Sequence, residues 1–159
     1  MFIKETKLLL VLLTLVSCSN TKKPIIIQEP TIAVYDESAL RYDFETKVGS
    51  KLYFTFDSAK LSGDANNLLS KQADWLMIHP YTTATIEGHC DEQGSREYNL
   101  ELGLRRAEAA KQALITNGIK SSRLKIVSYG KDRPAVEGHN IKAWKLNRRT
   151  VTNVSVNLD

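Results

Sequence analysis

The chain has 159 residues, of which 42% are hydrophobic and 25% are charged, and its formal net charge is +4. A chain of this length can bury a core of ordinary size, so a globular domain is expected. The charge is too mild to argue by itself for nucleic-acid binding.

The start of the sequence is typical of a secreted protein. A basic stretch is followed by an uncharged apolar run from Leu8 to Val16. This run is too short to span a bilayer as a helix, which needs about 20 residues, but it suits the apolar part of a signal peptide. It leads into LVSC, which resembles the lipobox of bacterial lipoproteins, where the cysteine is lipidated once the signal is removed. We therefore predict a signal peptide over residues 1–17 and lipidation at Cys18, which leaves Cys90 without a disulfide partner.

The next segment has no sustained periodicity up to about Thr46, and it contains two prolines. We predict a lipid-anchored tether over residues 18–46, in which the apolar run Ile25–Ile27 is suited to a local strand contact. A flexible coil of this length averages about 30 Å end to end and reaches roughly 90 Å when stretched. Such a tether would hold a domain at residues 47–159 away from a membrane.

Strand and helix patterns alternate through residues 47–159. Period-two alternation predicts strands, and apolar residues at helical spacing predict helices between them. Ser62 is placed to begin a helix that Pro80 ends, and Asn117 is placed to end the next helix. The predicted strands cover residues 51–57, 82–88, 124–130 and a last stretch with Val154, Val156 and Leu158 on one face; the predicted helices cover about 62–79, 97–117 and 141–147. The order βαβαβαβ predicts an α/β domain with helices packed on one sheet.

One short segment, Gly88–Glu92, concentrates groups that catalyse reactions or bind metals. Its imidazole, thiol and two carboxylates are on adjacent residues, which point to opposite faces of a strand and cannot converge on one ion without a sharp loop. Structural zinc sites also pair ligands from two clusters. Thiol catalysis would need His89 or His139 to reach Cys90 side-on, and no nucleophile motif surrounds that cysteine. Metal binding and thiol catalysis are therefore the weaker alternatives.

The same segment is suited to a ligand that carries two opposite charges. Asp91 lies in an acidic loop before a helix whose N-terminus favours a carboxylate. Arg105 and Arg106 follow in that helix, and because their side chains diverge by about 100° only one is expected to face the loop. An Asp and an Arg here form either a zwitterion pocket, in which Asp binds an ammonium and Arg a carboxylate, or a surface salt bridge contributing 0 to about 1 kcal/mol. Spacing alone slightly favours the salt bridge.

Four segments occur in order between about Leu52 and Val156: LYFTFDSAKL, TIEGHCDEQGSREYNLELGLRRAEAAKQAL, VSYGKDRPAVEGH and NRRTV. Together they closely resemble the OmpA-like C-terminal domain family. The resemblance implies an α+β sandwich with helices packed on a mixed four-stranded sheet. With the lipobox and the tether ahead of this domain, the chain looks like a lipoprotein of that family.

The family binds peptidoglycan non-covalently through the diaminopimelate residue of the peptide stem, whose side chain ends in an ammonium and a carboxylate. The positions that match its binding residues are Phe56, Asp57, Asp91, Asn99, Arg106 and Arg148. By resemblance, Asp91 would bind the ammonium and Arg106 the carboxylate. Phe56 and Asp57 would line the opposite wall. Asn99 would orient the loop, and Arg148 would border the pocket. His89 is expected to be structural.

The resemblance further implies a protein that is no enzyme and has no cofactor, held in the outer membrane by its lipid with the domain facing the periplasm. Ser19, rather than Asp, follows the lipidated cysteine and is compatible with that location. The expected partners are peptidoglycan, a periplasmic propeller protein of the Tol system that competes for the same face, and an inner-membrane Tol protein. These partners imply a role in envelope integrity and cell division.

The chain departs from the family pattern at two positions. Cys90 stands where Thr is common, which removes a hydroxyl from the loop, and Gln93 stands where Arg is frequent. Rival functions remain open: a wall hydrolase, or a structural lipoprotein that binds only protein partners. Nucleic-acid binding through the paired arginines is disfavoured by the compartment and by the lack of interleaved aromatic residues.

Overall fold

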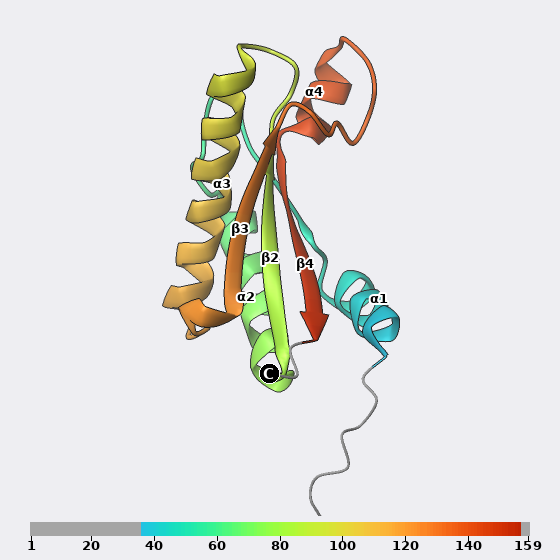
Figure 1. Ribbon diagram of the computed structural model, residues 1–159, viewed down its shortest axis with the longest axis vertical. Coiled ribbons are helices and arrows are strands. Elements are labelled where there is room, and N and C mark those ends of the chain that lie inside the picture. The colour runs from blue at the N-terminus through green and yellow to red at the C-terminus, as the bar shows by residue number, and fades with distance from the viewer. Residues whose placement is uncertain (1–35, 157–159) are drawn as a thin grey trace, which may run out of the picture. The chain divides into compact units, whose positions relative to one another are not determined.

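The computed structural model describes residues 36–156, and in this part the chain folds into helices packed on one sheet (Figure 1). The helices are α1 (Glu37–Lys47), α2 (Gly63–Ile78), α3 (Arg96–Thr116), α4 (Ile141–Asn147) and the short 3₁₀ helix η1 (Ser121–Arg123); the strands are β1 (Lys51–Tyr53), β2 (Thr82–His89), β3 (Leu124–Gly130) and β4 (Arg149–Val156). The strand order is β1-β4-β2-β3. Strand β4 is antiparallel to both of its neighbours, whereas β2 and β3 are parallel. The predicted α/β domain with a mixed four-stranded sheet is confirmed.

The two long helices begin and end at the residues that their sequences indicate. Ser62 and Ser95 are the N-caps of α2 and α3, and each side chain accepts a backbone N–H from the first turn at 3.1 Å. Asn117 ends α3, and Gly118 follows with φ +96°, the left-handed conformation that glycine adopts readily after a helix. These caps explain why the predicted helix limits agree with the observed ones.

The core lies between the sheet and the pair α2 and α3, which cover the same face in Figure 1. Leu69, Leu76, Ile86 and Leu114 are all 0% exposed. Burial of one such side chain contributes about 1.5–3 kcal/mol. Along β2 the residues between the buried ones are half-buried on the opposite face of the sheet, as is common where strands are antiparallel.

Helix α1 occupies residues for which the sequence predicts a coil. Asp36 caps it, and Phe44 is its buried side chain, packed edge-on against Trp75 with ring centroids 5.0 Å apart. Arg41 donates from Nε to the carbonyl of Val154 on β4 at 3.1 Å. A helix held mainly by one aromatic anchor gives little periodic signal, because tertiary packing supplies most of its stability. Residues 37–46, assigned to the tether from the sequence, are thus helical and packed on the domain.

The first strand is shorter than the prediction for residues 51–57. Strand β1 ends at Tyr53, although the N–H of Phe54 still donates to the carbonyl of Arg148 at 2.9 Å. The backbone then turns and reaches φ 52° at Asp57. A residue in the left-handed region cannot continue a strand, and the alternating side chains of this segment give no sign of the turn.

The predicted signal peptide, the lipidation site Cys18, the tether before residue 36 and Leu158 lie outside the described residues. Of the helices that the structure describes, none is both long enough and apolar enough to cross a membrane.

Candidate functional site

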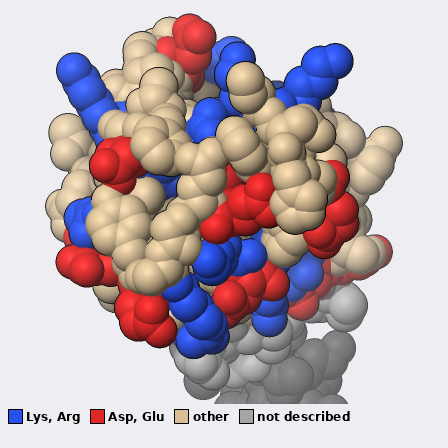
Figure 2. Space-filling model, turned by 90° about the horizontal axis from the view of Figure 1, so that it is seen from above, with Lys and Arg blue, Asp and Glu red and all other residues tan. Residues whose placement is uncertain are grey.

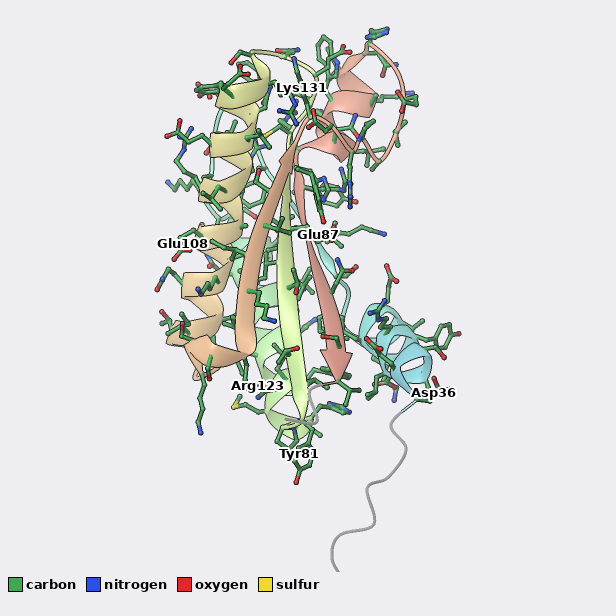
Figure 3. The ribbon with its side chains drawn as sticks, in the orientation of Figure 1. Asp36, Tyr81, Glu87, Glu108, Arg123 and Lys131 are labelled. Atoms are coloured by element: carbon green, nitrogen blue, oxygen red, sulfur yellow. The ribbon has the colours of Figure 1, made fainter. Side chains whose placement is uncertain are left out.

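Several loops meet at the end of the sheet where β2 and β3 finish, the upper end in Figure 1. With the first half of α3 they enclose a cavity of about 170 Å³. In Figure 3, Lys131 marks this end, whereas Tyr81 and Asp36 mark the opposite one. Figure 2 views the molecule from above and shows acidic and basic side chains interspersed, so this end does not present a charge of one sign.

All six residues that the sequence analysis assigns to ligand binding line this cavity, namely Phe56, Asp57, Asp91, Asn99, Arg106 and Arg148. The sequence analysis missed Tyr98 and Leu102, which also line it. These two lie one turn apart on α3, on the face that carries Asn99 and Arg106. The helical repeat from Arg106 could have found them.

Helix α3 packs against β2 with direct backbone contact. A Cβ atom at Gly88 on β2 would lie 1.9 Å from the carbonyl oxygen of Gly103 on α3. The contact therefore requires glycine on the strand, because any side chain would push the two elements apart. Arg106 lies one turn beyond Gly103, so the close approach places its side chain beneath the loop after β2.

Arg106 is 0% exposed and joins two loops through hydrogen bonds. Its Nε donates to the carbonyl of Ser58 at 2.8 Å, and Nη2 donates to that of Thr55 at 3.2 Å. Its Nη1 donates to the carbonyl of His89 at 2.9 Å and to Sγ of Cys90 at 3.3 Å. These bonds use four of the five N–H donors of a guanidinium. Burial lowers the pKa of Arg106, yet the group stays charged, and within residues 36–156 it forms no salt bridge with a carboxylate.

The carboxylate partner of Asp91 is Arg148, not Arg106. Oδ2 of Asp91 lies 2.8 Å from Nη1 of Arg148, and the side chains are 4% and 10% exposed. Oδ1 accepts the N–H of Gln93 at 3.1 Å, which shapes the loop. Nε of Arg148 also donates to the carbonyl of Phe54 at 3.2 Å. The surface salt bridge considered from the sequence is therefore wrong in both its partner and its exposure.

The opposite wall of the cavity is formed by the loop after β1. Phe56 is 61% exposed at its mouth. Asp57 is the one non-glycine residue with positive φ in the described part of the chain, and such conformations are favoured at binding sites. The hydroxyl of Tyr98 donates to the Asp57 carboxylate, and this hydrogen bond is the main cause that raises the pKa of Tyr98. The contact ties the wall to α3.

Asn99 holds the loop that follows β2. It is 1% exposed, and its Nδ2 donates to the carbonyls of Gln93 at 2.8 Å and Ser95 at 3.0 Å. The backbone carbonyl of Asn99 accepts a hydrogen bond from the Cys90 thiol at 3.3 Å. The side-chain amide and the backbone of this one buried residue thus fix the loop on both sides.

The same loop is supported from outside by the segment between β3 and β4. Lys131 donates to the carbonyls of Gly94 at 2.6 Å and Glu92 at 3.3 Å. The Glu92 carboxylate accepts the indole N–H of Trp144 at 2.8 Å and contacts His139. The hydrogen bond from Trp144, with His139 adding to it, lowers the pKa of Glu92. The sequence analysis missed Lys131 and Trp144, because these contacts join segments far apart in the chain.

The thiol in this loop is poorly suited to catalysis. Burial raises the pKa of Cys90, so the thiol keeps its proton, and the thiolate is the nucleophilic form. His139, which the sequence analysis considered as its base, contacts Glu92 instead. Over residues 36–156, no group of three or more His, Cys, Asp or Glu side chains could hold a metal ion.

His89 lies beneath the loop and is 2% exposed. Neither ring nitrogen makes a hydrogen bond of good geometry within the described residues, although Nε2 lies 3.4 Å from Oε2 of Glu87. Burial, with the charge of Arg149 adding to it, lowers the pKa of His89 to about 4. The imidazole is therefore neutral at pH 7 and packs as part of the structure.

The fold and the cavity define a class: a small α/β domain with buried charged side chains at a pocket on one end of its sheet. Comparison with models of known protein families narrows this class to one family. The chain belongs to the OmpA family, whose model matches residues 53–148.

Several known proteins and solved structures are similar to this chain. The peptidoglycan-associated lipoprotein of Mesorhizobium japonicum is 46% identical over 113 residues, which cover 71% of this chain and 67% of the relative. That of Agrobacterium fabrum is also 46% identical, but the match spans only 62% of its length. That of Pasteurella multocida is 36% identical and is matched over 93% of this chain and 97% of its own length. The crystal structure of the peptidoglycan-associated lipoprotein from Burkholderia pseudomallei superposes with a TM-score of 0.65 at 38% identity, covering 67% of this chain and 90% of the other.

Proposed function

We propose that the chain is a lipid-anchored outer-membrane protein that binds peptidoglycan without catalysis, through the diaminopimelate side chain of the stem peptide. The names of its relatives, peptidoglycan-associated lipoproteins, support this proposal. So does the cavity, which is lined by both acidic and basic side chains.

One observation carries the proposal. Arg106 is fully buried, lines the cavity and bonds only backbone carbonyls and a thiol among the described residues. A buried charge is costly unless an opposite charge approaches it. The guanidinium has one further N–H donor, and a ligand carboxylate that enters the cavity would supply the direct ionic partner that Arg106 lacks among the described residues.

Two carboxylates in the cavity lining are placed to bind the ammonium of the ligand. Asp91 is buried and shared with Arg148, whereas Asp57 is exposed at the mouth and held by Tyr98. With Arg106 these residues give two positive and two negative charges in the lining. A zwitterion adds no net charge to such a set, which is why we favour the diaminopimelate end over a simple anion.

Lipidation at Cys18 would hold the other end of the chain in the outer membrane. The chain from Cys18 to Asp36 would reach about 60 Å when extended. Lipid at one end and wall contact at the other would tie the membrane to the wall. Work with a periplasmic propeller protein and an inner-membrane protein of the Tol system, and hence a part in cell division, belongs to the same proposal.

Co-sedimentation with purified diaminopimelate-type sacculi tests the binding. We expect the wild-type chain to pellet and Arg106→Ala to lose about tenfold or more in affinity, because a charge-assisted hydrogen bond contributes about 1.5–3 kcal/mol. Arg105→Ala is the matched control, since the adjacent Arg105 is exposed and pairs with Glu101. If both folded variants pellet like the wild type, the cavity is not the binding site.

Two further measurements separate the rival functions. A soluble propeller partner added to the sacculi should displace the chain, and undiminished wall binding would argue against a shared face.

A hydrolase would release muropeptides from sacculi and would lose that activity in Cys90→Ser. We expect no release from either the wild type or this variant.

A further inference from the structure

A second hollow adjoins the proposed diaminopimelate pocket. It has a volume of about 410 Å³, larger than the 170 Å³ of the pocket. It lies between the end of β1 and α4, and its lining consists of Tyr53, Phe54, Thr55, Lys145, Leu146 and Arg148. Arg148 lines both hollows, so a ligand that fills the pocket has its next part close to this groove.

The groove presents an apolar surface with a few polar groups at its edge. Tyr53 is 48% exposed, because Leu52 takes the inward position on β1 and the next residue points outward. Leu146 on α4 is 42% exposed. The polar groups are the hydroxyls of Tyr53 and Thr55, the ammonium of Lys145 and the guanidinium of Arg148, which is paired with Asp91. An apolar lining with few polar groups is typical of small-molecule sites.

A pyranose ring matches this chemistry better than a purely apolar ligand does. One face of such a ring carries C–H bonds with partial positive charge, and the face of an aromatic ring is negative. The ring hydroxyls and acetamido groups can bond the hydroxyl groups at the edge. The carboxyl that joins sugar to peptide is an amide and carries no charge, but Lys145 can pair with a free carboxylate of the stem peptide beside the sugar, which gives the groove charge complementarity to an anionic wall polymer.

We propose that this groove binds an aminosugar of the glycan strand from which the bound stem peptide extends. The inference rests on the proposed function, because it assumes that the pocket holds the stem. The wall polymer would then contact the domain at two adjoining subsites, the pocket through its diaminopimelate end and the groove through its sugar.

Calorimetric titration of the full chain with two ligands tests the subsite. One ligand is a free tetrapeptide stem containing diaminopimelate, and the other is the same stem attached to its disaccharide. We expect the wild type to bind the disaccharide form about two- to tenfold more tightly, the effect of one aromatic contact. Tyr53→Ala should abolish that difference and leave the affinity for the free stem unchanged, and Lys145→Gln should reduce it.

Tyr42→Ala is the matched control, because Tyr42 is 72% exposed and lies on α1, away from the pocket. It should keep the full preference for the disaccharide form. Equal affinities of the wild type for the two ligands would overturn the subsite and leave the proposed function standing. A Tyr53→Ala variant weakened equally for both ligands would also overturn it. If the wild type binds neither ligand, the proposed function fails and the subsite fails with it.

Discussion

Arg123 and Arg106 lie at opposite ends of the sheet, and both guanidinium groups donate mainly to backbone carbonyls. Arg123, labelled at the lower end in Figure 3, bonds the carbonyls of Leu76, His79 and Thr82 at 2.7–2.9 Å. Burial lowers the pKa of both arginines. Carbonyl bonding alone therefore does not mark a ligand site.

The difference lies in what compensates each charge. Leu76 and His79 are at the C-terminus of α2, where the helix dipole is negative and stabilises a cation, and Arg123 is also partly exposed to water. Arg106 has neither benefit: it is 0% exposed, and its carbonyl partners belong to loops and a strand end. Arg123 is thus stabilised where it lies, whereas Arg106 has no carboxylate in direct contact among the described residues, and a ligand can bring one.

The largest loss of stability is expected when Arg148, like Arg106, is left without a carboxylate in direct contact. Asp91→Asn removes the carboxylate partner of Arg148, whose side chain is 10% exposed. Loss of one partner from a buried pair costs about 3–5 kcal/mol in the free energy of unfolding, because the remaining charge stays buried. Urea denaturation measures this loss.

The matched control for Asp91→Asn is Asp132→Asn, which removes the partner of Arg96 from an exposed ion pair. We expect its unfolding midpoint to stay near that of the wild type, because exposed pairs contribute little. Equal losses in the two variants would show that the pair of Asp91 and Arg148 is not effectively buried.

The upper end should also be the part of the fold that acid destabilises. Burial lowers the pKa of His89 from 6.5 to about 4, so the folded state resists a proton that the unfolded state accepts. His89 thus contributes stability that is present above about pH 6.5 and is lost as the pH falls towards 4, by up to about 3 kcal/mol. Unfolding free energies measured across this range should fall more steeply for the wild type than for His89→Gln. Parallel curves would contradict the prediction.

The sequence predicts the scaffold better than the charge pairing of the site. Helix limits follow from local caps such as Ser62 and Ser95, and strand faces follow from alternation, so both are encoded within a few residues. The partner of Asp91 is 57 residues away in the chain, and no local pattern distinguishes Arg148 from Arg106 as that partner. Helix α1 was missed for a related reason, since its stability depends on a distant ring rather than on its own periodicity.

Ligand-linked stability tests the contrast between the two arginines directly. A ligand at 100 times its Kd raises the free energy of unfolding by about 2.7 kcal/mol. With the diaminopimelate tetrapeptide in excess, the Tm of the wild type should rise. Arg123→Lys should lower the starting Tm but show the same rise on adding ligand. Arg106→Lys should show little rise, since an ammonium with three donors cannot both replace the bonds to the two loops and leave an N–H for the ligand carboxylate. The same ligand-induced rise of the Tm in both variants would show that Arg106 contributes no more to ligand binding than Arg123 does.

The smallest effect is expected at the wall of the pocket, from Tyr98→Phe. The hydroxyl of Tyr98 holds the carboxylate of Asp57, whose backbone has φ 52°, so its loss frees a strained residue at the mouth without opening the core. Both side chains are exposed, and we expect global stability to change little but affinity for the tetrapeptide to fall by about threefold. Asparagine tolerates the same backbone conformation as aspartate, and the Asp57→Asn variant should by itself weaken binding of the tetrapeptide. If the hydrogen bond acts by positioning Asp57, the double variant should bind no worse than Asp57→Asn alone. Losses that multiply in the double variant would mean that Tyr98 contacts the ligand itself rather than orienting Asp57.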